Sequence, residues 1–310
     1  MKKPNLFIAG HPRSGTSSLH DYLNQHPEIF MTSIKEPNYF ARDFHEESDN
    51  FHNKKLYLPY RTEKQYLKLY SRWKKEKLAG EASWTNLYSM VAAKEIGGFN
   101  QQAKIIIMFR EPVDFLHSYH SAAIFSLGED YKEFIKALAV EKERKNGNCL
   151  SNRVITPSWL YYTEFIKYAE QINRFFSAFH VDQIKIIVFE YFINETQKIY
   201  KEILEFLNVD ADFTPEFNII NPNKILKWPR LKKYTLDSPY FRKTLRLLFS
   251  DDQYAAMKKF YKDKIVTYQP RPPLDKSLRK ELMTKFKAEV EKTNELLKID
   301  LIALWGYDKI

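Results

Sequence analysis

The sequence contains a single cysteine and no hydrophobic stretch long enough to cross a membrane. Because Cys149 stands alone, an internal disulfide and a metal site built from cysteines are both excluded. The longest aliphatic run near an expected strand covers residues 105–109, far below the ~20 apolar residues of a membrane span. Met1 and two lysines lead directly into strand-like residues without an apolar leader. We therefore expect no signal peptide and a cytoplasmic protein.

The sequence also lacks the lysine that an ordinary nucleotide-hydrolase loop requires. Residues 5–19 have the pattern of a short apolar strand, a turn with glycines at both ends, and a helix that opens on three hydroxyl residues. Gly10 and Gly15 have the G-x-x-x-x-G spacing, but Thr16 follows where the Walker pattern has lysine. The cation lies inside the loop, at Arg13. This pattern predicts that a phosphate-like group binds at a helix N-terminus without ordinary ATP chemistry.

Composition indicates a globular protein with a basic surface. Of the 310 residues, 44% are hydrophobic, and the mean hydropathy is −0.51, so the chain has enough apolar material for a sizeable core. The net charge is +10, but the basic residues are spread over the expected helices and form no nucleic-acid motif. A highly anionic small cofactor, or a solvated lysine-rich surface, explains the positive charge equally well. We therefore expect no nucleic-acid partner.

Strand-like and helix-like segments alternate along the chain, which favours a parallel sheet flanked by helices. We predict one P-loop-like α/β domain over residues 1–310, with a helical extension at the C-terminus. No linker divides the chain and no internal repeat is present. The expected strands cover residues 6–10, 29–32, 78–81, 104–109 and 184–189. The expected helices cover residues 16–25, 62–73, 112–125, 158–179, 196–207 and 276–297.

One segment of the last third is strongly basic. Between residues 224 and 246 there are eight lysines or arginines against one acid, with aromatic residues interleaved. A solvated face explains such a segment, and so does a surface that contacts a membrane or another polyanion. A third interpretation is a variable lid, over residues 224–275, that covers an acceptor cleft.

Two further motifs are placed to act together with the Arg13 loop. Arg110 follows the clearest strand, and Ser118 lies on the helix that Pro112 opens. Glu36 follows the second strand. Because ligands of parallel sheets bind outside the carboxyl ends of the strands, these residues are expected at one edge. The set predicts two anion sites and one carboxylate that could serve as a general base.

These segments resemble the PAPS-dependent sulfotransferase family, in particular its bacterial and heparan-sulfate-type branch. The resemblance extends, in order, over nearly the whole chain. It rests on residues 11–19 (HPRSGTSSL), 35–40 (KEPNYF), 80–83 (GEAS), 109–114 (FREPVD), 184–191, 205–209 and 272–275.

The resemblance implies roles for individual residues. The loop would bind the 5′-phosphosulfate of 3′-phosphoadenosine 5′-phosphosulfate (PAPS), and its cation, usually lysine and here Arg13, would neutralise charge on the bridging oxygen. Arg110 and Ser118 would hold the 3′-phosphate, and Glu36 would take the proton of an acceptor hydroxyl. The product would be PAP, and no metal is implied. Asn38 stands where many relatives carry histidine. The loop residues assigned to the donor are Arg13, Ser14, Gly15, Thr16, Ser17 and Ser18.

Alternatives remain open from the sequence. A P-loop kinase using ATP would need an acidic Walker-B-type residue at a strand end, whereas Phe109 is followed by Arg110. A basic module that binds membranes or polyanions is the other alternative. Glu81 also ends a strand and competes with Glu36 as the base. The acceptor hydroxyl could belong to a glycan, a lipid or another small molecule, and the oligomeric state is open. The histidines near the motifs are expected to be packing or surface residues: His11, His20, His117 and His120.

Overall fold

The computed structural model describes residues 2–126, 128–218, 224–226, 266–268 and 271–310. The chain divides into two compact units, one of residues 1–220 with 274–310 and one of residues 221–273. In the second unit, β6 (Lys224–Leu226) pairs antiparallel with β7 (Val266–Tyr268). The basic segment 224–246 and the predicted lid 224–275 fall mainly outside the described residues. The lid and the single-domain boundary therefore stay predictions.

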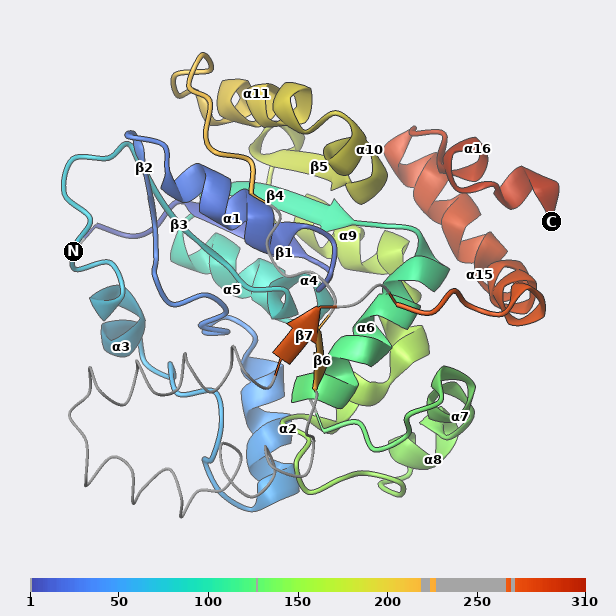
Figure 1. Cartoon of the computed structure of the whole chain (residues 1–310). Coiled ribbons are helices and arrows are strands. Elements are labelled where there is room, and N and C mark those ends of the chain that lie inside the picture. The colour runs from blue at the N-terminus through green and yellow to red at the C-terminus, as the bar shows by residue number, and fades with distance from the viewer. Residues whose placement is uncertain (1, 127, 219–223, 227–265, 269–270) are drawn as a thin grey trace. The chain divides into compact units, whose positions relative to one another are not determined.

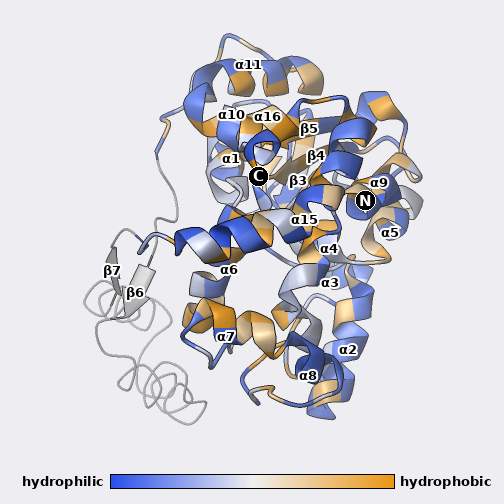
Figure 2. Cartoon of the chain, turned by 90° about the vertical axis from the view of Figure 1, so that its right-hand side faces the viewer, coloured by the Kyte–Doolittle hydropathy of each residue, from blue (hydrophilic) through white to orange (hydrophobic). Residues whose placement is uncertain are grey.

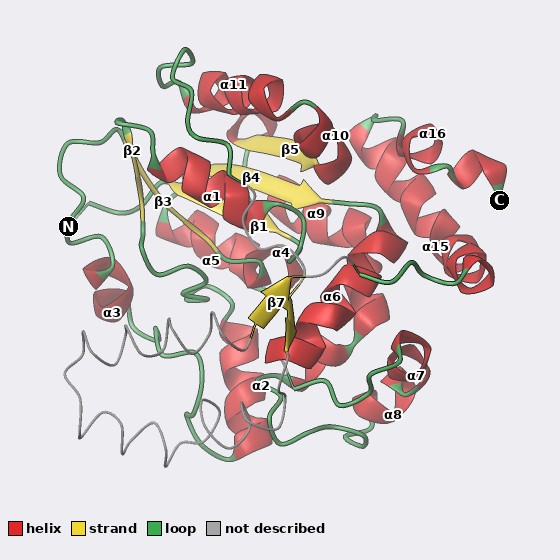
Figure 3. Ribbon diagram, viewed as in Figure 1, coloured by secondary structure: helices red, strands yellow, loops and turns green. Residues whose placement is uncertain are grey.

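The first unit is built on a five-stranded sheet of order β2-β3-β1-β4-β5, in which every pairing is parallel (Figures 1 and 3). β1 therefore lies at the centre, and Ile8 pairs with Ile106 of β4. The predicted parallel sheet is confirmed. The strands are β1 (Leu6–Gly10), β2 (Ile29–Met31), β3 (Leu78–Ala82), β4 (Lys104–Phe109) and β5 (Ile184–Val188).

Helices cover both faces of this sheet, because side chains alternate between the faces along each strand. Ile105 and Ile107 of β4 belong to a core cluster that includes residues of α5, α6, α9 and α15. Ile106 and Met108 belong to a second cluster, with residues of α1, α10 and α11. The helices are α1 (Thr16–Asn24), α2 (Arg42–His52), α3 (Glu63–Lys68), α4 (Thr85–Tyr88), α5 (Ala92–Phe99), α6 (Pro112–Ser126), α7 (Phe134–Ala139), α8 (Glu141–Lys145), α9 (Tyr168–Phe176), α10 (Phe189–Asn194), α11 (Thr196–Leu207), α15 (Lys276–Leu297) and α16 (Leu301–Trp305).

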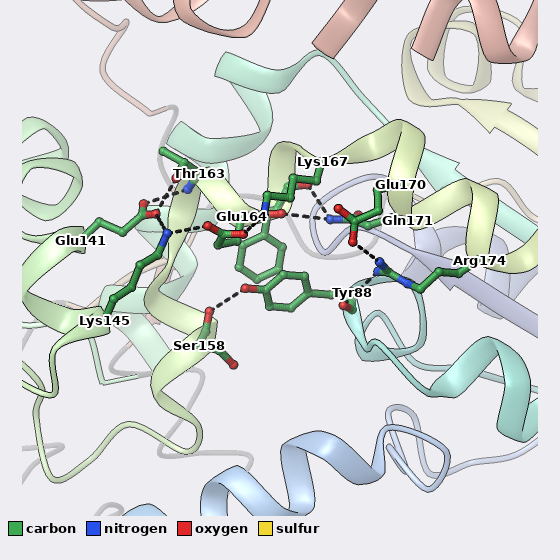
Figure 4. Close-up of polar contacts among 11 residues, drawn as sticks. Tyr88, Glu141, Lys145, Ser158, Thr163, Glu164, Lys167, Glu170, Gln171 and Arg174 are labelled. Atoms are coloured by element: carbon green, nitrogen blue, oxygen red, sulfur yellow. Dashed lines mark hydrogen bonds and ion pairs between the residues drawn. The ribbon is translucent and has the colours of Figure 1, made fainter. Parts of the chain in front are cut away.

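The helix predicted over residues 158–179 is wrong in its first half. Two short 3-10 helices, Pro157–Leu160 and Tyr162–Ile166, precede α9. Side chains bind the backbone groups that a continuous helix would have paired, as Figure 4 shows. A Glu141 oxygen accepts from the Thr163 N–H at 2.8 Å, and the Gln171 amide donates to two carbonyls of this segment at 3.1 Å each. Apolar spacing alone does not reveal such competition from distant side chains.

The C-terminal residues form the predicted helical extension. α15 covers Lys276–Leu297, as the sequence indicates, and packs against α6 and α9. Its buried face includes Leu282, Phe286 and Val290, and hydrophilic residues predominate on its side that faces the viewer in Figure 2. The Trp305 indole donates to Glu190 at 3.0 Å, which ties α16 to α10. None of the described helices has the length and apolar character needed to cross a bilayer.

Candidate active site

The loop between β1 and α1 has backbone geometry suited to an anion. Arg13 has φ 67° and Gly15 has φ 88°, both in the left-handed region. A side chain on Gly15 would also lie within 3.2 Å of Met108 and Phe192 atoms, so glycine is required there. Gly15 precedes the first residue of α1, and no side chain caps that helix. The first N–H groups of α1 therefore lack the side-chain cap that helix N-termini often have, and they carry the positive end of the helix dipole.

Two arginines meet beside this loop. Nε of Arg13 donates to the Ser118 hydroxyl at 3.2 Å, and Nη1 of Arg110 donates to the Arg13 carbonyl at 3.2 Å. Burial, together with the charge of Arg110, lowers the pKa of Arg13. Within the described part of the chain, no salt bridge joins either guanidinium to a carboxylate. Two adjacent cations with no acidic partner favour an anionic ligand.

Contacts with neighbouring residues fix Arg110 in place, but one nitrogen of its guanidinium has no hydrogen-bond partner among the described residues. Its guanidinium carbon lies 4.4 Å from the centroid of the Phe189 ring, and its carbonyl accepts from the Tyr168 hydroxyl at 3.0 Å. Nε of Arg110 is buried and has no hydrogen-bond partner among the described residues. A buried, unpaired N–H of this kind carries an energetic penalty unless a ligand satisfies it.

The turn after Arg110 is held by a buried acid. Glu111 accepts from the N–H groups of Val113 at 3.0 Å and Asp114 at 2.7 Å, so it caps α6. The Tyr307 hydroxyl donates to the same carboxylate at 2.8 Å. Burial raises the pKa of Glu111. The C-terminal extension thus contributes directly to positioning the strand end that carries Arg110.

Glu36 reaches the same edge of the sheet from the loop after β2. Its N–H donates to the Ala82 carbonyl at 3.0 Å, and its φ is 59°. Its carboxylate is 41% exposed and lies 3.5 Å from Nζ of Lys35. The Lys35 ammonium also donates to the Ser17 hydroxyl in the first turn of α1. Lys35 therefore joins the Glu36 loop to the first turn of α1.

Asn38 has a structural role in the Glu36 loop. Its N–H donates to the Ser83 hydroxyl at 3.2 Å, and its side-chain oxygen accepts from Thr85 at 2.7 Å. Ser83 in turn donates to Glu81 at 2.6 Å. These bonds fix the backbone from Glu36 to Asn38 against the end of β3. The side chain of Asn38 thus stabilises the conformation of the Glu36 loop.

Glu81 differs sharply from Glu36 in its surroundings. It is fully buried, and Asn86 donates to it at 3.1 Å in addition to Ser83. Burial raises the pKa of Glu81 to about 7, with the Glu36 carboxylate contributing in the same direction. The positive charge of Lys35 acts to lower the pKa of Glu81. A carboxyl enclosed in this way is not open to an acceptor hydroxyl, whereas the exposed Glu36 is.

The other loop residues divide into buried and half-buried positions. Ser14 is fully buried, and its hydroxyl has no partner among the described residues. Thr16 is buried as well, while Ser17 and Ser18 are half-buried. Ser18 hydrogen-bonds the Tyr22 side chain. Contacts therefore join Arg13 to Arg110 and Ser118, and join Ser17 to Glu36 through Lys35. Ser18 is engaged along its own helix.

The histidines near the loop are packing residues. His11 lies between the rings of Phe115 and Tyr168, with centroid distances of 4.9 and 4.5 Å. Its Nε2 bonds the Gln171 side-chain oxygen at 2.7 Å. Burial lowers the pKa of His11 to about 4, so the ring is neutral near pH 7. Burial likewise lowers the pKa of His20 to about 4. His117 and His120 pack near the Phe134 ring.

Three residues of this site were not singled out from the sequence. Lys35 stands beside Glu36 in the sequence, and its positive charge could have identified it as a residue of the site. Phe189 and Gln171 carry no chemical motif, and only the folded chain brings them to Arg110 and His11. Among the described residues, no group of three or more His, Cys, Asp or Glu side chains could hold a metal ion.

Comparison with known proteins identifies the family. The family model described as Sulfotransferase domain matches residues 3–285. A crystal structure of a sulfotransferase from Alicyclobacillus acidocaldarius superposes with a TM-score of 0.71 at 24% identity, covering 99% of this chain and 100% of that one.

Two curated relatives share part of their length with this chain. Mouse carbohydrate sulfotransferase 15 is 23% identical over 66% of this chain and 44% of its own length. The mouse bifunctional heparan sulfate N-deacetylase/N-sulfotransferase 1 is 25% identical over 67% of this chain and 22% of its own length. The chain thus spans less than half the length of these two relatives. With the family model matched over most of its length, the chain belongs to the sulfotransferase family.

Proposed function

We propose that this protein transfers a sulfuryl group from PAPS to an acceptor hydroxyl by in-line displacement. The observation that carries the proposal is the direct contact of Arg13 and Arg110 beside an uncapped helix N-terminus. Neither arginine forms a salt bridge to a carboxylate in the described residues, and the carboxylate of Glu36 is connected to the same loop through Lys35. Such a site offers charge to an anionic donor and a base to a neutral acceptor.

The residues present fit this donor. The buried, unpartnered Nε of Arg110 and the buried hydroxyl of Ser14 are polar groups that a phosphate or sulfate oxygen would satisfy. Arg110 and Ser118 would hold the 3′-phosphate, and the loop with Arg13 would hold the 5′-phosphosulfate. When bound, PAPS supplies the sulfuryl group and a phosphate leaving group. Arg13 keeps its proton, so its role is to bind and neutralise negative charge.

Glu36 is the better placed of the two candidate bases. Its carboxylate is 41% exposed, so an acceptor hydroxyl can reach it, and it lies 3.5 Å from the Lys35 ammonium. Glu81 is enclosed, and its hydrogen bonds are directed to Ser83 and Asn86. We assign proton abstraction from the acceptor to Glu36 and a supporting role to Glu81.

The kinase alternative is less well supported. An ATP site of this class uses an acid at a strand end to hold magnesium. β4 is followed by Arg110, and the next residue, Glu111, is occupied in capping α6 and in bonds to Tyr307 and Arg279. ATP turnover with magnesium, measured beside PAPS turnover, would decide between the two reactions.

Calorimetric binding of PAP tests the proposal. We expect the wild-type protein to bind PAP, and we expect Arg13→Gln and Arg110→Gln each to weaken binding by roughly 10-fold or more, as loss of a charge-assisted contact does. Arg153→Gln is the matched control, because Arg153 forms an exposed ion pair with Asp130. Absence of PAP binding by the wild type would contradict the proposal. Equal binding by both arginine variants would contradict the assignment of the donor site.

A screen with radiolabelled PAPS would identify the acceptor. The screen should contain soluble oligosaccharides, lipids and small phenols, since each offers a hydroxyl. Oligosaccharides come first, because one relative is named as a carbohydrate sulfotransferase. Transfer of the label to none of these classes, with PAP binding intact, would direct the search to amine acceptors. Cytoplasmic location and contact with a membrane or polyanion stay predictions.

A further inference from the structure

We propose that Lys35 is a second cation of the donor site, which binds the 5′-phosphate end of the nucleotide. This inference rests on the proposed function and extends it to a residue outside the loop. It arises from one contact across the sheet edge: the Lys35 ammonium, which follows β2, donates to the Ser17 hydroxyl in the first turn of α1.

The Lys35 ammonium lies in a part of the site that already carries positive charge. The N-terminus of a helix carries partial positive charge, so a cation placed there is repelled. Arg13 adds a full charge nearby and acts to lower the pKa of Lys35, in addition to the larger effect of burial. The side chain of Lys35 is only 26% exposed, which limits its hydration. The Glu36 and Glu81 carboxylates act on the pKa of Lys35 in the opposite direction, and each does so more strongly than Arg13.

The geometry also explains how the chain manages without a loop lysine. The side chain of Arg13 is directed to Ser118 by the bond from its Nε. The first turn of α1 is approached instead by Lys35, through Ser17. Lys35 therefore adds to Arg13 a compact ammonium with three donors at the first turn of α1.

The charge that Lys35 would meet is defined by the reaction. A bond forms between the acceptor oxygen and sulfur, and the bond between sulfur and the bridging oxygen breaks. The electron pair of that bond stays on the 5′-phosphate of PAP, and the acceptor proton passes to Glu36. The 5′-phosphate thus gains negative charge as sulfur leaves, and Lys35 stabilises that charge.

Binding of two nucleotides tests the inference without knowledge of the acceptor. PAP carries both phosphates, whereas adenosine 3′-monophosphate lacks the 5′-phosphate. The ratio of their dissociation constants therefore reports contacts to the 5′-phosphate alone. We expect Lys35→Met to reduce the preference for PAP by roughly 10-fold or more, because charge-assisted hydrogen bonds are lost. We expect Lys35→Arg, which keeps the charge, to retain most of the preference.

Lys77→Met is the matched control. Lys77 forms an ion pair with Glu28 and lies just before β3, at the opposite end of the strands. Its substitution should leave the preference for PAP unchanged.

The possible outcomes separate the inference from the proposed function. An unchanged preference in Lys35→Met would overturn the role of Lys35. Equal weakening of both nucleotides would also overturn it, since a purely structural tie between the loops predicts that result. A wild-type protein that binds neither nucleotide would contradict the proposed function itself. If Lys35→Met does not fold, Lys35→Gln replaces it, because this variant keeps a polar group for Ser17 and removes the charge. An unchanged preference for PAP in Lys35→Gln would equally overturn the inference.

Discussion

Arg13 and Ser118 are 105 residues apart in sequence, yet Nε of the arginine donates to the serine hydroxyl at 3.2 Å. The bond joins the loop after β1 to the middle of α6. It places the residues assigned to the two ends of the donor in direct contact. Arg13, Ser118 and Arg110, which the sequence assigns to two anion sites, therefore lie in contact with one another.

Loss of this hydroxyl should weaken donor binding. Ser118 is only 2% exposed, so Ser118→Ala removes a polar atom without opening the surface. We expect PAP affinity to fall by roughly 3- to 10-fold, the effect of one hydrogen bond to a charged partner. Calorimetry would measure it. Ser121→Ala, on the same helix with its hydroxyl bonded to the His117 carbonyl, should bind PAP like the wild type.

The aromatic ring under Arg110 should contribute through cation–π attraction. Phe189→Leu keeps the site apolar but removes the ring that lies 4.4 Å from the guanidinium carbon. We expect PAP affinity to fall by roughly 5- to 30-fold, since a partly buried cation–π pair contributes about 1–2 kcal/mol. Tyr191→Leu is the control on the same helix, because Tyr191 is exposed. Equal affinities of the Phe189 variant and the wild type would argue against this role.

Glu81 should make stability depend on pH in a definite direction. Burial raises its pKa from the ordinary 4.5 to about 7. The folded protein therefore holds this proton more tightly than the unfolded chain, and the resulting stabilisation is fully present below about pH 4.5. It is lost as the pH rises to about 7.

Glu81→Gln removes the ionisable carboxyl, so the variant should not lose this stabilisation as the pH rises. We expect the stability of the variant relative to the wild type to rise by about 3 kcal/mol between pH 4.5 and 7.5. His11, whose pKa is lowered to about 4, acts in the opposite direction in both proteins, so only the difference between them is diagnostic. Urea unfolding of both proteins at four pH values measures it. Glu133→Gln, at an exposed ion pair, should show no such trend, and a flat difference for Glu81→Gln would contradict the prediction.

Gln171 should stabilise the base of the loop. It is 1% exposed, its amide oxygen accepts from His11 at 2.7 Å, and its amide nitrogen donates to two backbone carbonyls. Gln171→Leu leaves these buried groups without a partner, and we expect a loss of roughly 2–4 kcal/mol in the free energy of unfolding. Chemical denaturation measures the loss.

A double variant gives the control for Gln171. His11 lies between two aromatic rings, so a phenylalanine there removes the polar partner while keeping the stacking. We expect His11→Phe combined with Gln171→Leu to be more stable than Gln171→Leu alone. No recovery in the double variant would show that the bond to His11 is not the source of the loss.

Local sequence patterns predicted much of the fold. The five strands and the helices at 196–207 and 276–297 were expected close to their observed bounds, because apolar periodicity reports which residues face a core. The prediction over 158–179 was wrong, since Glu141 and Gln171 bind backbone groups that a helix would use. Several short helices, α2 and α5 among them, were not predicted. Their formation depends on packing against neighbours more than on their own sequence pattern.

The sequence by itself determined the sulfotransferase resemblance, the glycine-flanked loop before α1 and the strand ends at which Glu36 and Arg110 lie. These properties are local, because glycine spacing, helix starts and strand ends follow from neighbouring residues. Only the tertiary structure decided which side chains meet. The contacts of Arg13 with Ser118, of Lys35 with Ser17 and of His11 with Gln171 join distant segments. It also decided that Glu81 is enclosed and Glu36 open, because burial is a property of the packed chain.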